Sequence, residues 1–236
     1  MGGTMGLREK IQDSSAVVGV IGLGYVGLPL LRAFCITGFR VIGFDVDQRK
    51  VERLKRKENY LQHLGEHFVD EMVDSGRFDA TSDFGRMGEA DVLISCVPTP
   101  LGVHLEPDLC FVEQTADDIA KTLRAQQLIV LESSTYPGTT REVMLPRFKA
   151  KGLECGKDFY LAYSPEREDP GRKDHNTQTI PKLVGGIDPV SGELATMLYR
   201  RAIKQVIPVS TAEVAEAAKI LENTYRSVSI ALVNEM

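Results

Sequence analysis

Three glycines in the spacing G-x-G-x-x-G follow directly after an apolar run near the start of the chain. The run is Val17–Ile21, and the glycines are Gly22, Gly24 and Gly27. In a strand–turn–helix unit, the first glycine lets the chain turn out of the strand, the second removes a side chain that would block a pyrophosphate, and the third lets the helix pack close to the sheet. Unpaired N–H groups at the start of that helix favour a bound phosphate. The pattern therefore predicts a dinucleotide-binding turn.

A second apolar run, residues 41–44, ends at Asp45. The spacing of Asp45 from Gly22 is the one expected for a carboxylate that accepts hydrogen bonds from the ribose of the dinucleotide. A polar residue at the end of a strand is also a common turn former, and for Asp45 taken alone this alternative stays open. A ribose-binding carboxylate would favour NAD over NADP, because a 2′-phosphate would meet a like charge.

Composition excludes several classes of protein. The 236 residues are 43% hydrophobic and 26% charged, which is typical of a globular protein with a sizeable core. The net charge of -5, without a block of Lys or Arg, argues against a nucleic-acid partner. The first residues lack the pattern of a signal peptide, and the longest apolar stretch is too short to span a membrane, so we expect a cytoplasmic protein without a membrane partner. The four cysteines are scattered without a C-x-x-C pair, so no metal site is expected.

Apolar runs alternate with amphipathic segments along the chain, which predicts an α/β fold with a doubly wound, mostly parallel sheet. After the first strand, the expected strands are residues 41–44, 92–96, 128–131, 160–162, 182–184 and 206–209. Asp188 followed by Pro189 predicts an N-cap and the first helical position of a helix that runs through Arg200.

The last part of the chain is expected to form one long helix. Residues 210–213, Ser-Thr-Ala-Glu, fit a capping box, and helix-compatible sequence continues to Met236. One apolar stripe has helical spacing, and further apolar residues fall off it. The stripe consists of Val214, Ala217, Leu221, Tyr225, Val228 and Leu232, and the residues off it are Ile220, Ile230 and Val233. Such a helix needs a second partner, either a following domain or another subunit; the alternative is a terminal helix packed on its own sheet.

Three loops that follow predicted strands are polar in a way that suits a ligand site. They are residues 97–100, 132–140 and 164–171. Each loop taken alone is equally well explained as a turn rich in Ser, Thr and Pro. Ligands of an open α/β sheet bind outside the carboxyl ends of the strands, where all three loops and the glycine turn must meet. Together the loops predict a site at this edge.

At these residues the chain resembles the nucleotide-sugar 6-dehydrogenases, the family of UDP-glucose, UDP-N-acetylglucosamine and UDP-N-acetylmannosamine dehydrogenases. The shared motifs, in order, are G-x-G-Y-V-G-L-P, the Asp45 strand, V-P-T-P, E-S-S-T-Y-P-G-T, S-P-E-R, and A-E-x-x-K-x-x-E-N in the last helix. The resemblance implies a Rossmann NAD-binding domain over residues 16–209, after an arm over residues 1–15. From residue 210 it implies the first helix of a helical central domain, through which the chain would form a homodimer.

The activity that the resemblance implies is a double oxidation of the C6 hydroxyl of a UDP-sugar to a carboxylate, with two NAD used in succession, to supply polysaccharide precursors. The loop S-P-E-R-E-D-P-G is more similar to the branch that uses N-acetylated sugars, and Pro170 stands where UDP-glucose dehydrogenases tend to carry a second glutamate. We therefore expect a UDP-N-acetylhexosamine as substrate, with UDP-N-acetylglucosamine as the first choice.

Catalytic roles carry over position by position. The resemblance implies that Thr135 and Glu166 handle the proton and water chemistry, and that Lys219 and Asn223 hold the developing oxyanion. Lys219 and Asn223 are four residues apart on one helix face, which supports their pairing, and a carboxylate opposite them would complete an acid–base site. Without the resemblance, a surface lysine near acidic neighbours is the simpler interpretation of Lys219.

Binding roles carry over in the same way. The implied cofactor contacts are Gly22, Gly24, Tyr25, Val26, Gly27, Asp45, Lys50, Thr99 and Thr135. The implied substrate contacts are Glu166, Arg167, Lys219 and Asn223.

One part of the family pattern is missing. The family traps an aldehyde on a cysteine in a later G-G-H-C motif, and this chain has no such motif. The chain thus looks like the N-terminal half of a longer enzyme and is not expected to complete turnover alone. Two alternatives remain: another two-domain Rossmann dehydrogenase, of the 3-hydroxyacid or 6-phosphogluconate type, and a non-catalytic dinucleotide-binding module.

Overall fold

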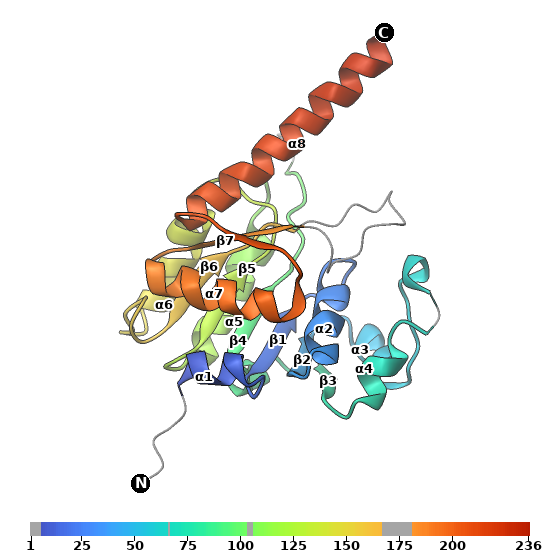
Figure 1. Ribbon diagram of the computed structural model, residues 1–236, viewed down its shortest axis with the longest axis vertical. Coiled ribbons are helices and arrows are strands. Elements are labelled where there is room, and N and C mark those ends of the chain that lie inside the picture. The colour runs from blue at the N-terminus through green and yellow to red at the C-terminus, as the bar shows by residue number, and fades with distance from the viewer. Residues whose placement is uncertain (1–5, 66, 103–105, 167–180) are drawn as a thin grey trace.

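One sheet organises the protein in a computed structural model that describes residues 6–65, 67–102, 106–166 and 181–236 (Figure 1). Its eight described strands lie in the order β3-β2-β1-β4-β5-β6-β7-β8. They are β1 Val17–Ile21, β2 Arg40–Phe44, β3 Phe78–Thr81, β4 Val92–Ser95, β5 Leu128–Leu131, β6 Tyr160–Tyr163, β7 Lys182–Gly186 and β8 Val206–Pro208. Among these described strands, only β6 and β7 pair antiparallel. The predicted α/β fold with a mostly parallel sheet is confirmed.

Strand β3 is the one described strand that the sequence pattern did not predict. It has four residues, Phe-Asp-Ala-Thr, of which only Ala80 is fully buried. An edge strand is short and partly exposed, so it lacks the apolar run by which the inner strands were recognised. The other strands agree with the predicted bounds to within two residues. Helix α7 also begins as predicted, at Pro189 after the N-cap Asp188.

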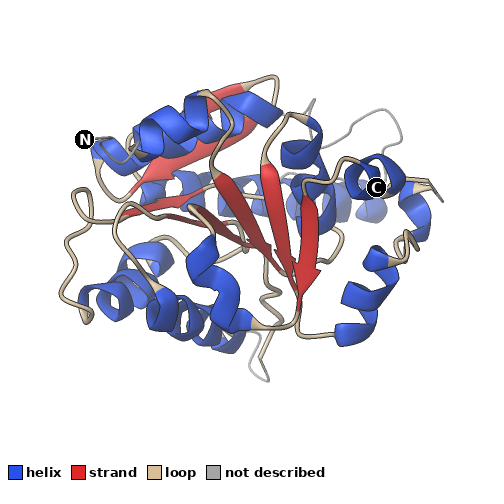
Figure 2. Ribbon diagram, turned by 90° about the horizontal axis from the view of Figure 1, so that it is seen from below, coloured by secondary structure: helices blue, strands red, loops and turns tan. Residues whose placement is uncertain are grey.

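Helices cover both faces of the sheet (Figure 2). The first face carries α1 Leu7–Gln12, α2 Gly27–Ile36, α3 Gln48–Lys55, α4 Asp70–Asp74 and α7 Pro189–Ala202, and the second carries η2 Phe84–Glu89, α5 Cys110–Thr122, η3 Thr140–Met144, α6 Leu145–Lys149 and the first turns of α8 Ala212–Glu235. Along β5, Leu128 and Val130 belong to the first core, and Ile129 and Leu131 belong to the second. Because both faces are covered, the inner strands are apolar at successive positions.

Helix α8 begins one residue later than the predicted capping box requires. Its N-cap is Thr211, not Ser210, and the Thr211 hydroxyl accepts a hydrogen bond of 3.4 Å from the Val214 N–H. The carboxylate of Glu213 forms an ion pair of 2.5 Å with Arg141 and also interacts with the Thr211 side chain, so it is not the third residue of a box that begins at Ser210. The helix was predicted correctly, but its capping box was not.

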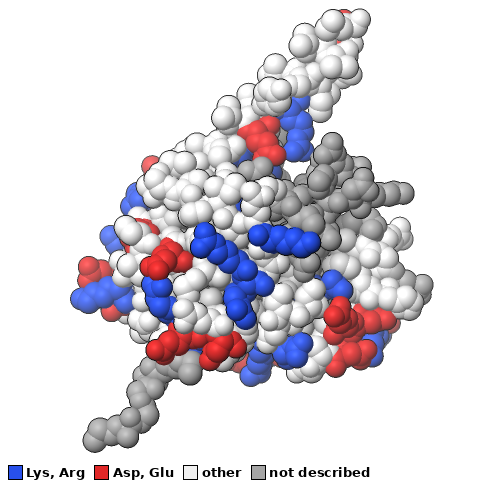
Figure 3. Space-filling view, viewed as in Figure 1, with Lys and Arg blue, Asp and Glu red and all other residues white. Residues whose placement is uncertain are grey.

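The two halves of α8 differ in environment. Ala212, Ala215, Glu216 and Lys219 are buried against the body of the protein, whereas the later turns extend away from it (Figure 1). The exposed apolar side chains of this projecting part are Ile220, Leu221, Tyr225, Val228, Ile230, Leu232 and Val233. The part of α8 in view in Figure 3 carries few charged side chains toward its end. The alternative of a terminal helix packed on its own sheet is therefore wrong for this part of α8. None of the described helices is long and apolar enough to cross a membrane.

Candidate functional site

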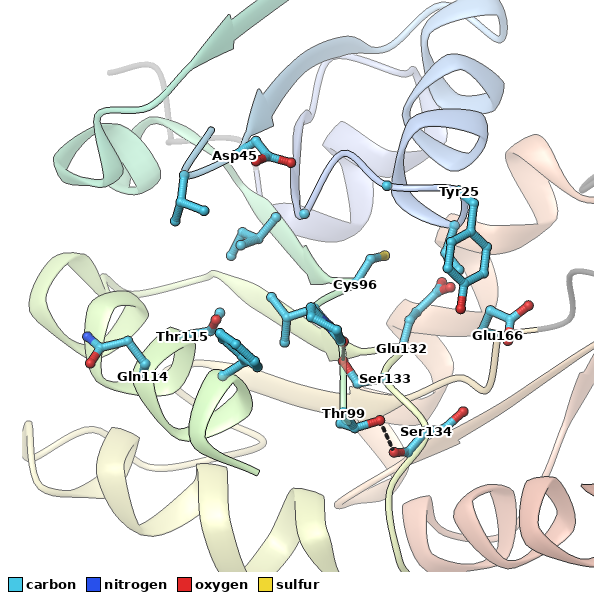
Figure 4. Close-up of a pocket in the computed structure, with 18 of the residues that line it drawn as sticks. Tyr25, Asp45, Cys96, Thr99, Gln114, Thr115, Glu132, Ser133, Ser134 and Glu166 are labelled. Atoms are coloured by element: carbon cyan, nitrogen blue, oxygen red, sulfur yellow. Dashed lines mark hydrogen bonds between the residues drawn. The ribbon is translucent and has the colours of Figure 1, made fainter. Parts of the chain in front are cut away.

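A pocket of about 410 Å³ lies outside the carboxyl ends of the central strands (Figure 4). Residues from the glycine turn and from all three predicted polar loops contribute to its wall. The lining residues are Ile21, Gly22, Gly24, Tyr25, Val26, Asp45, Val46, Lys50, Phe84, Cys96, Val97, Pro98, Thr99, Phe111, Gln114, Thr115, Asp118, Glu132, Ser133, Ser134 and Glu166. The volume is within the range of pockets that bind small molecules. The topology thus brings the loops to one edge of the sheet.

The glycine turn has room for a ligand at one position only. Gly22 has a φ of +90°, and a Cβ there would lie 2.7 Å from the Cys96 carbonyl oxygen. A Cβ on Gly27 would lie 1.9 Å from the Gly22 carbonyl oxygen, so the start of α2 packs directly on the turn. A Cβ on Gly24 would meet no protein atom within 4 Å. The first and third glycines are therefore required by the protein itself, whereas Gly24 leaves open the side that faces the pocket.

Asp45 is held by the backbone and by a lysine. Its Oδ2 accepts hydrogen bonds from the Leu23 N–H at 2.9 Å and from Lys50 Nζ at 3.0 Å, and its Oδ1 accepts one from the Asp47 N–H at 2.9 Å. Asp45 thus organises the turn and also lines the pocket. Lys50 pairs directly with the Asp45 carboxylate and offsets part of its charge, and its predicted contact with the cofactor stays a prediction.

The loops after β4 and β5 are joined side by side. The Thr99 hydroxyl donates to the Ser134 carbonyl oxygen at 2.7 Å, as the dashed line in Figure 4 shows, and the Ser133 hydroxyl donates to the Val97 carbonyl oxygen at 2.6 Å. Because each hydroxyl spans the two loops, the pocket wall between them is fixed by side chains as well as by the sheet.

Thr135 lies just beyond the pocket wall. It is buried, and within the described residues its Oγ1 has no hydrogen-bond partner, although Tyr163 is a near neighbour. A buried hydroxyl without a partner is unfavourable in a folded protein. The structure therefore places Thr135 next to Ser134 of the lining with its hydroxyl buried near Tyr163, and its predicted contacts stay predictions.

Glu166 lines the pocket, and Lys219 contacts it from α8. Lys219 Nζ donates to the Glu166 carbonyl oxygen at 2.8 Å and lies 3.5 Å from its Oε2. The Glu166 side chain is 14% exposed and the Lys219 side chain is 8% exposed. Glu166 follows β6 and Lys219 lies on α8, so the buried first half of that helix brings them together. The interpretation of Lys219 as a surface lysine is wrong.

Two predicted site residues are not placed at this point. Asn223 lies one turn beyond Lys219 on α8 and is exposed, because the helix has already left the body of the protein there. The expected convergence of Lys219 and Asn223 on one point is thus not seen in the described residues. Arg167 and Pro170 lie outside the described residues.

Sequence reasoning missed a buried charged pair behind the pocket. Lys182 Nζ lies 2.9 Å from Glu132 Oε2, and the two side chains are 5% and 1% exposed. The Tyr199 hydroxyl donates to the other carboxylate oxygen of Glu132. Burial raises the pKa of Glu132, and Lys182 opposes this rise. A lone lysine at the start of a buried strand was the available signal, since such a charge requires a partner.

A second missed residue is Glu216, one turn before Lys219 on α8. Its carboxylate accepts hydrogen bonds from the Gly138 N–H at 2.6 Å, the Thr140 N–H at 2.9 Å and the Thr140 hydroxyl at 2.6 Å. Glu216 therefore fixes α8 to the loop that carries Thr135. The sequence signal was an acidic residue within a helix whose neighbours are small and apolar, but nothing local indicated its partners.

Comparison with known proteins agrees with this geometry. The sequence profile of the UDP-glucose/GDP-mannose dehydrogenase family, NAD binding domain, matches residues 16–203. The chain belongs to this family. It is 38% identical over 221 residues to Protein CapL of Staphylococcus aureus and 37% identical over 223 residues to the UDP-N-acetyl-D-glucosamine 6-dehydrogenase of Pseudomonas aeruginosa. The solved structure of the UDP-D-ManNAc dehydrogenase from Pyrococcus horikoshii superposes with a TM-score of 0.87 at 31% identity, over 93% of this chain and 52% of that one.

As a member of this family, the chain carries its NAD-binding domain, and NAD is the cofactor. The residues present fit the molecule. The turn is open at Gly24 on the side where a pyrophosphate would lie, and Asp45 borders the pocket next to it. The apolar side chains of Val46, Phe84 and Phe111 line the same pocket and suit a flat base. The predicted cofactor is confirmed, and the contact of each residue with it remains a prediction.

The chain spans about half the length of the relatives it matches, 51% of both CapL and the Pseudomonas enzyme. Its cysteines do not stand in the family's G-G-H-C context. Burial raises the pKa of Cys155 to about 11, which makes its thiol a poor nucleophile. Cys96 does line the pocket, a position that the scattered cysteine spacing did not indicate.

Proposed function

We propose that this chain is the NAD-binding half of an enzyme that oxidises the C6 hydroxyl of a UDP-sugar to a carboxylate. The observation that carries the proposal is the contact of Lys219 with Glu166, which lines the NAD pocket. A carboxylate and an ammonium group, both largely buried and held by different elements, are suited to move a proton and to stabilise an oxyanion at one carbon atom.

Each residue has a distinct part in this proposal. NAD, held against the turn at Gly24 and beside Asp45, would supply the hydride acceptor. The Glu166 carboxylate accepts the proton of the hydroxyl, directly or through an ordered water, and the Lys219 ammonium group stabilises the oxygen as negative charge develops on it. Lys219 is oriented in advance, because it donates to the Glu166 carbonyl oxygen. The family resemblance gives Thr135 a part in the proton and water chemistry, and its buried hydroxyl lies behind Ser134 of the pocket wall.

The substrate that we propose is a UDP-N-acetylhexosamine, with UDP-N-acetylglucosamine first. The similarity to the UDP-N-acetyl-D-glucosamine 6-dehydrogenase of Pseudomonas aeruginosa supports this choice. An enzyme that contains this chain and a G-G-H-C segment should oxidise UDP-N-acetylglucosamine faster than UDP-glucose in an NADH absorbance assay. A strong preference for UDP-glucose would contradict the choice of sugar, and activity only on a nucleotide-free hydroxyacid would contradict the proposed reaction.

Glu166→Gln tests the role of the carboxylate in that same enzyme. The amide keeps the size of the side chain but cannot accept a proton, so we expect turnover to fall about 100-fold while NAD affinity changes little. Glu52→Gln, on the exposed side of α3, is the matched control and should leave both unchanged. Turnover that is retained in Glu166→Gln would remove Glu166 from the mechanism.

The chain alone should bind NAD without sustained turnover. A cysteine that can trap the aldehyde requires an activated thiolate near the reacting carbon, and no cysteine here stands in the family's motif. Calorimetry should therefore detect the binding of NAD to the chain. When NAD and a UDP-sugar are both present, the absorbance of NADH should not rise continuously. Continuous NADH formation would show that the chain is catalytically complete. Binding of NAD without any UDP-sugar activity in the longer protein would instead favour a non-catalytic dinucleotide-binding module.

We further propose a homodimer through the projecting part of α8. Its apolar side chains include Leu221, Tyr225 and Val233, which are 71%, 75% and 71% exposed. A contiguous apolar surface of this kind is unusual on a monomer. Sedimentation equilibrium should therefore give twice the chain mass, and Leu221→Glu combined with Val233→Glu should return the monomer. A monomeric parent at high concentration would contradict the dimer.

A further inference from the structure

Two successive carbonyl groups at the end of the Ser164–Pro165–Glu166 segment each accept a hydrogen bond from a buried lysine. Lys182 Nζ donates to the Pro165 carbonyl oxygen at 3.4 Å, and Lys219 Nζ donates to the Glu166 carbonyl oxygen at 2.8 Å. Lys182 begins β7 and Lys219 lies on α8, so the segment is held by two different elements. Lys219 belongs to the proposed reaction, and Lys182 has no role assigned so far.

The position of the Lys182 ammonium group is tightly defined. Glu132 Oε2 lies 2.9 Å away, the centroid of the Tyr199 ring lies 5.1 Å away, and the Tyr199 hydroxyl binds the other oxygen of the carboxylate. A buried ammonium group that is paired in this way loses little freedom when it binds a further acceptor, because its side chain is already ordered. Glu132 also lines the pocket, so the pair lies directly behind the cofactor site.

Stability alone does not account for this pair. The desolvation of two charges largely cancels their attraction, and apolar side chains of similar volume are often equally stable or more stable in such a place. What an apolar pair cannot supply is a donor to the Pro165 carbonyl oxygen. The Glu166 carboxylate is also close enough to add to the raised pKa of Glu132, which is due first to burial. The Glu132–Lys182 pair therefore lies close to Glu166, the predicted proton acceptor.

We propose that Lys182, held by Glu132, is a positioning residue that fixes the backbone at Glu166 and so aims the Glu166 carboxylate into the NAD pocket. The inference rests on the proposed function, since that function gives Glu166 its task. Lys182 acts through Glu166 and touches neither sugar nor cofactor. Its loss should loosen the segment and lower the rate of the chemical step without weakening NAD binding.

The deciding variant is Glu132→Gln combined with Lys182→Met. It removes both charges together, so no unpaired charge remains buried, and it removes the donor to Pro165. Its melting temperature and NAD affinity should stay close to those of the parent. NMR relaxation of the chain as it stands should show the order parameter of the Glu166 amide falling from about 0.85 to below about 0.6. In an enzyme with a G-G-H-C segment, kcat should fall about 100-fold with little change in KM for the UDP-sugar.

Two further variants separate positioning from general stabilisation. Lys182→Arg keeps the charge and the donor, so it should retain the rigid Glu166 amide and most of the kcat. Tyr199→Phe removes a hydrogen bond from the same network but leaves the Lys182 contact with Pro165, so it should lower the melting temperature while the Glu166 amide stays ordered.

The double variant can overturn the proposal in two ways: an ordered Glu166 amide, or an unchanged kcat. If the double variant does not fold, a disordered Glu166 amide in Lys182→Arg or in Tyr199→Phe would overturn it equally. Failure of the proposed function would look different, because the parent itself would then bind no NAD or show no activity on a UDP-sugar in the longer enzyme, whatever Lys182 does to the order of Glu166.

Discussion

The two ends of the pocket are built by different means. The nucleotide end consists of the glycine turn and Asp45, which come from the first 45 residues and are held by backbone contacts such as the Leu23 N–H on Asp45. The end at which we propose the reaction, called the reacting end below, consists of side chains that lie far apart in the sequence. Lys182 and Glu132 are separated by 50 positions, and Lys219 and Glu166 by 53.

This difference predicts how the two ends respond to substitution. At the nucleotide end, the effect of a substitution depends on the space for the new side chain. The atoms that it would meet there belong to the backbone and cannot move aside. At the reacting end, buried charges are paired with partners from other elements. The loss of one partner leaves the other charge buried and unpaired, which destabilises the folded state. Effects at the first end should follow side-chain volume, and effects at the second should follow charge.

The largest effect is expected from Gly27→Ala. The new Cβ would lie 1.9 Å from the Gly22 carbonyl oxygen, so the turn and the start of α2 must separate. We expect the free energy of unfolding to fall by about 3 kcal/mol or more and NAD binding to be lost. Urea unfolding and calorimetry measure the two quantities.

Gly24→Ala is the matched control for that experiment. Its Cβ meets no protein atom within 4 Å, so the stability should stay within about 0.5 kcal/mol of the parent. NAD affinity should nevertheless fall about tenfold or more, because the methyl group occupies the side on which we place the pyrophosphate. Normal NAD binding by this variant would show that the pyrophosphate lies elsewhere.

Next in size is Glu216→Gln at the reacting end. The carboxylate accepts from two N–H groups and one hydroxyl, whereas an amide has one oxygen and would turn its own NH₂ toward a donor. We expect a loss of about 2 kcal/mol in urea unfolding. Glu213→Gln, which disturbs the more exposed pair with Arg141, should cost less than about 1 kcal/mol. Equal losses in the two variants would contradict the view that burial of charge governs this end.

The same contrast explains how far the sequence could be interpreted. The glycine turn and Asp45 were found from local spacing, because a short stretch of chain contains every atom on which their geometry depends. Glu166 and Lys219 needed the family resemblance, since neither residue type nor spacing shows that α8 returns to the end of β6. Glu132 was noted only as the first residue of a polar loop, and Lys182 and Glu216 were given no role. Their significance lies in buried contacts between distant elements, which have no period in the sequence.

The pH dependence of stability should have opposite signs at the two ends. Burial raises the pKa of Glu216, so its folded form holds the proton more tightly than the unfolded chain does. Its contribution to stability is therefore full below the unfolded value of about 4.3 and is lost as the pH rises through the folded pKa. The advantage of the parent over Glu216→Gln in urea unfolding should therefore shrink as the pH rises above the unfolded value of about 4.3.

Asp47 at the nucleotide end provides the comparison. Its hydrogen bonds with Arg49 lower the pKa of Asp47, so its contribution is present above the unfolded value and is lost as the pH falls through the folded pKa. The advantage of the parent over Asp47→Asn should therefore grow with rising pH. Parallel trends for the two variants would mean that burial does not distinguish the two ends.

The smallest effect is expected from Lys50→Met, and it concerns the choice between NAD and NADP. Lys50 Nζ lies 3.0 Å from Asp45 Oδ2, so it offsets part of the charge that would repel a 2′-phosphate. The N–H groups of Leu23 and Asp47 continue to hold the Asp45 carboxylate when Lys50 is replaced. Calorimetry should therefore show the preference for NAD increasing about fivefold, equivalent to about 1 kcal/mol, while Lys50→Arg leaves it unchanged. If Lys50→Met weakens both cofactors equally, Lys50 binds the shared part of the molecule and charge does not set the preference. If the parent already binds NADP as tightly as NAD, the assignment of Asp45 to the ribose is wrong.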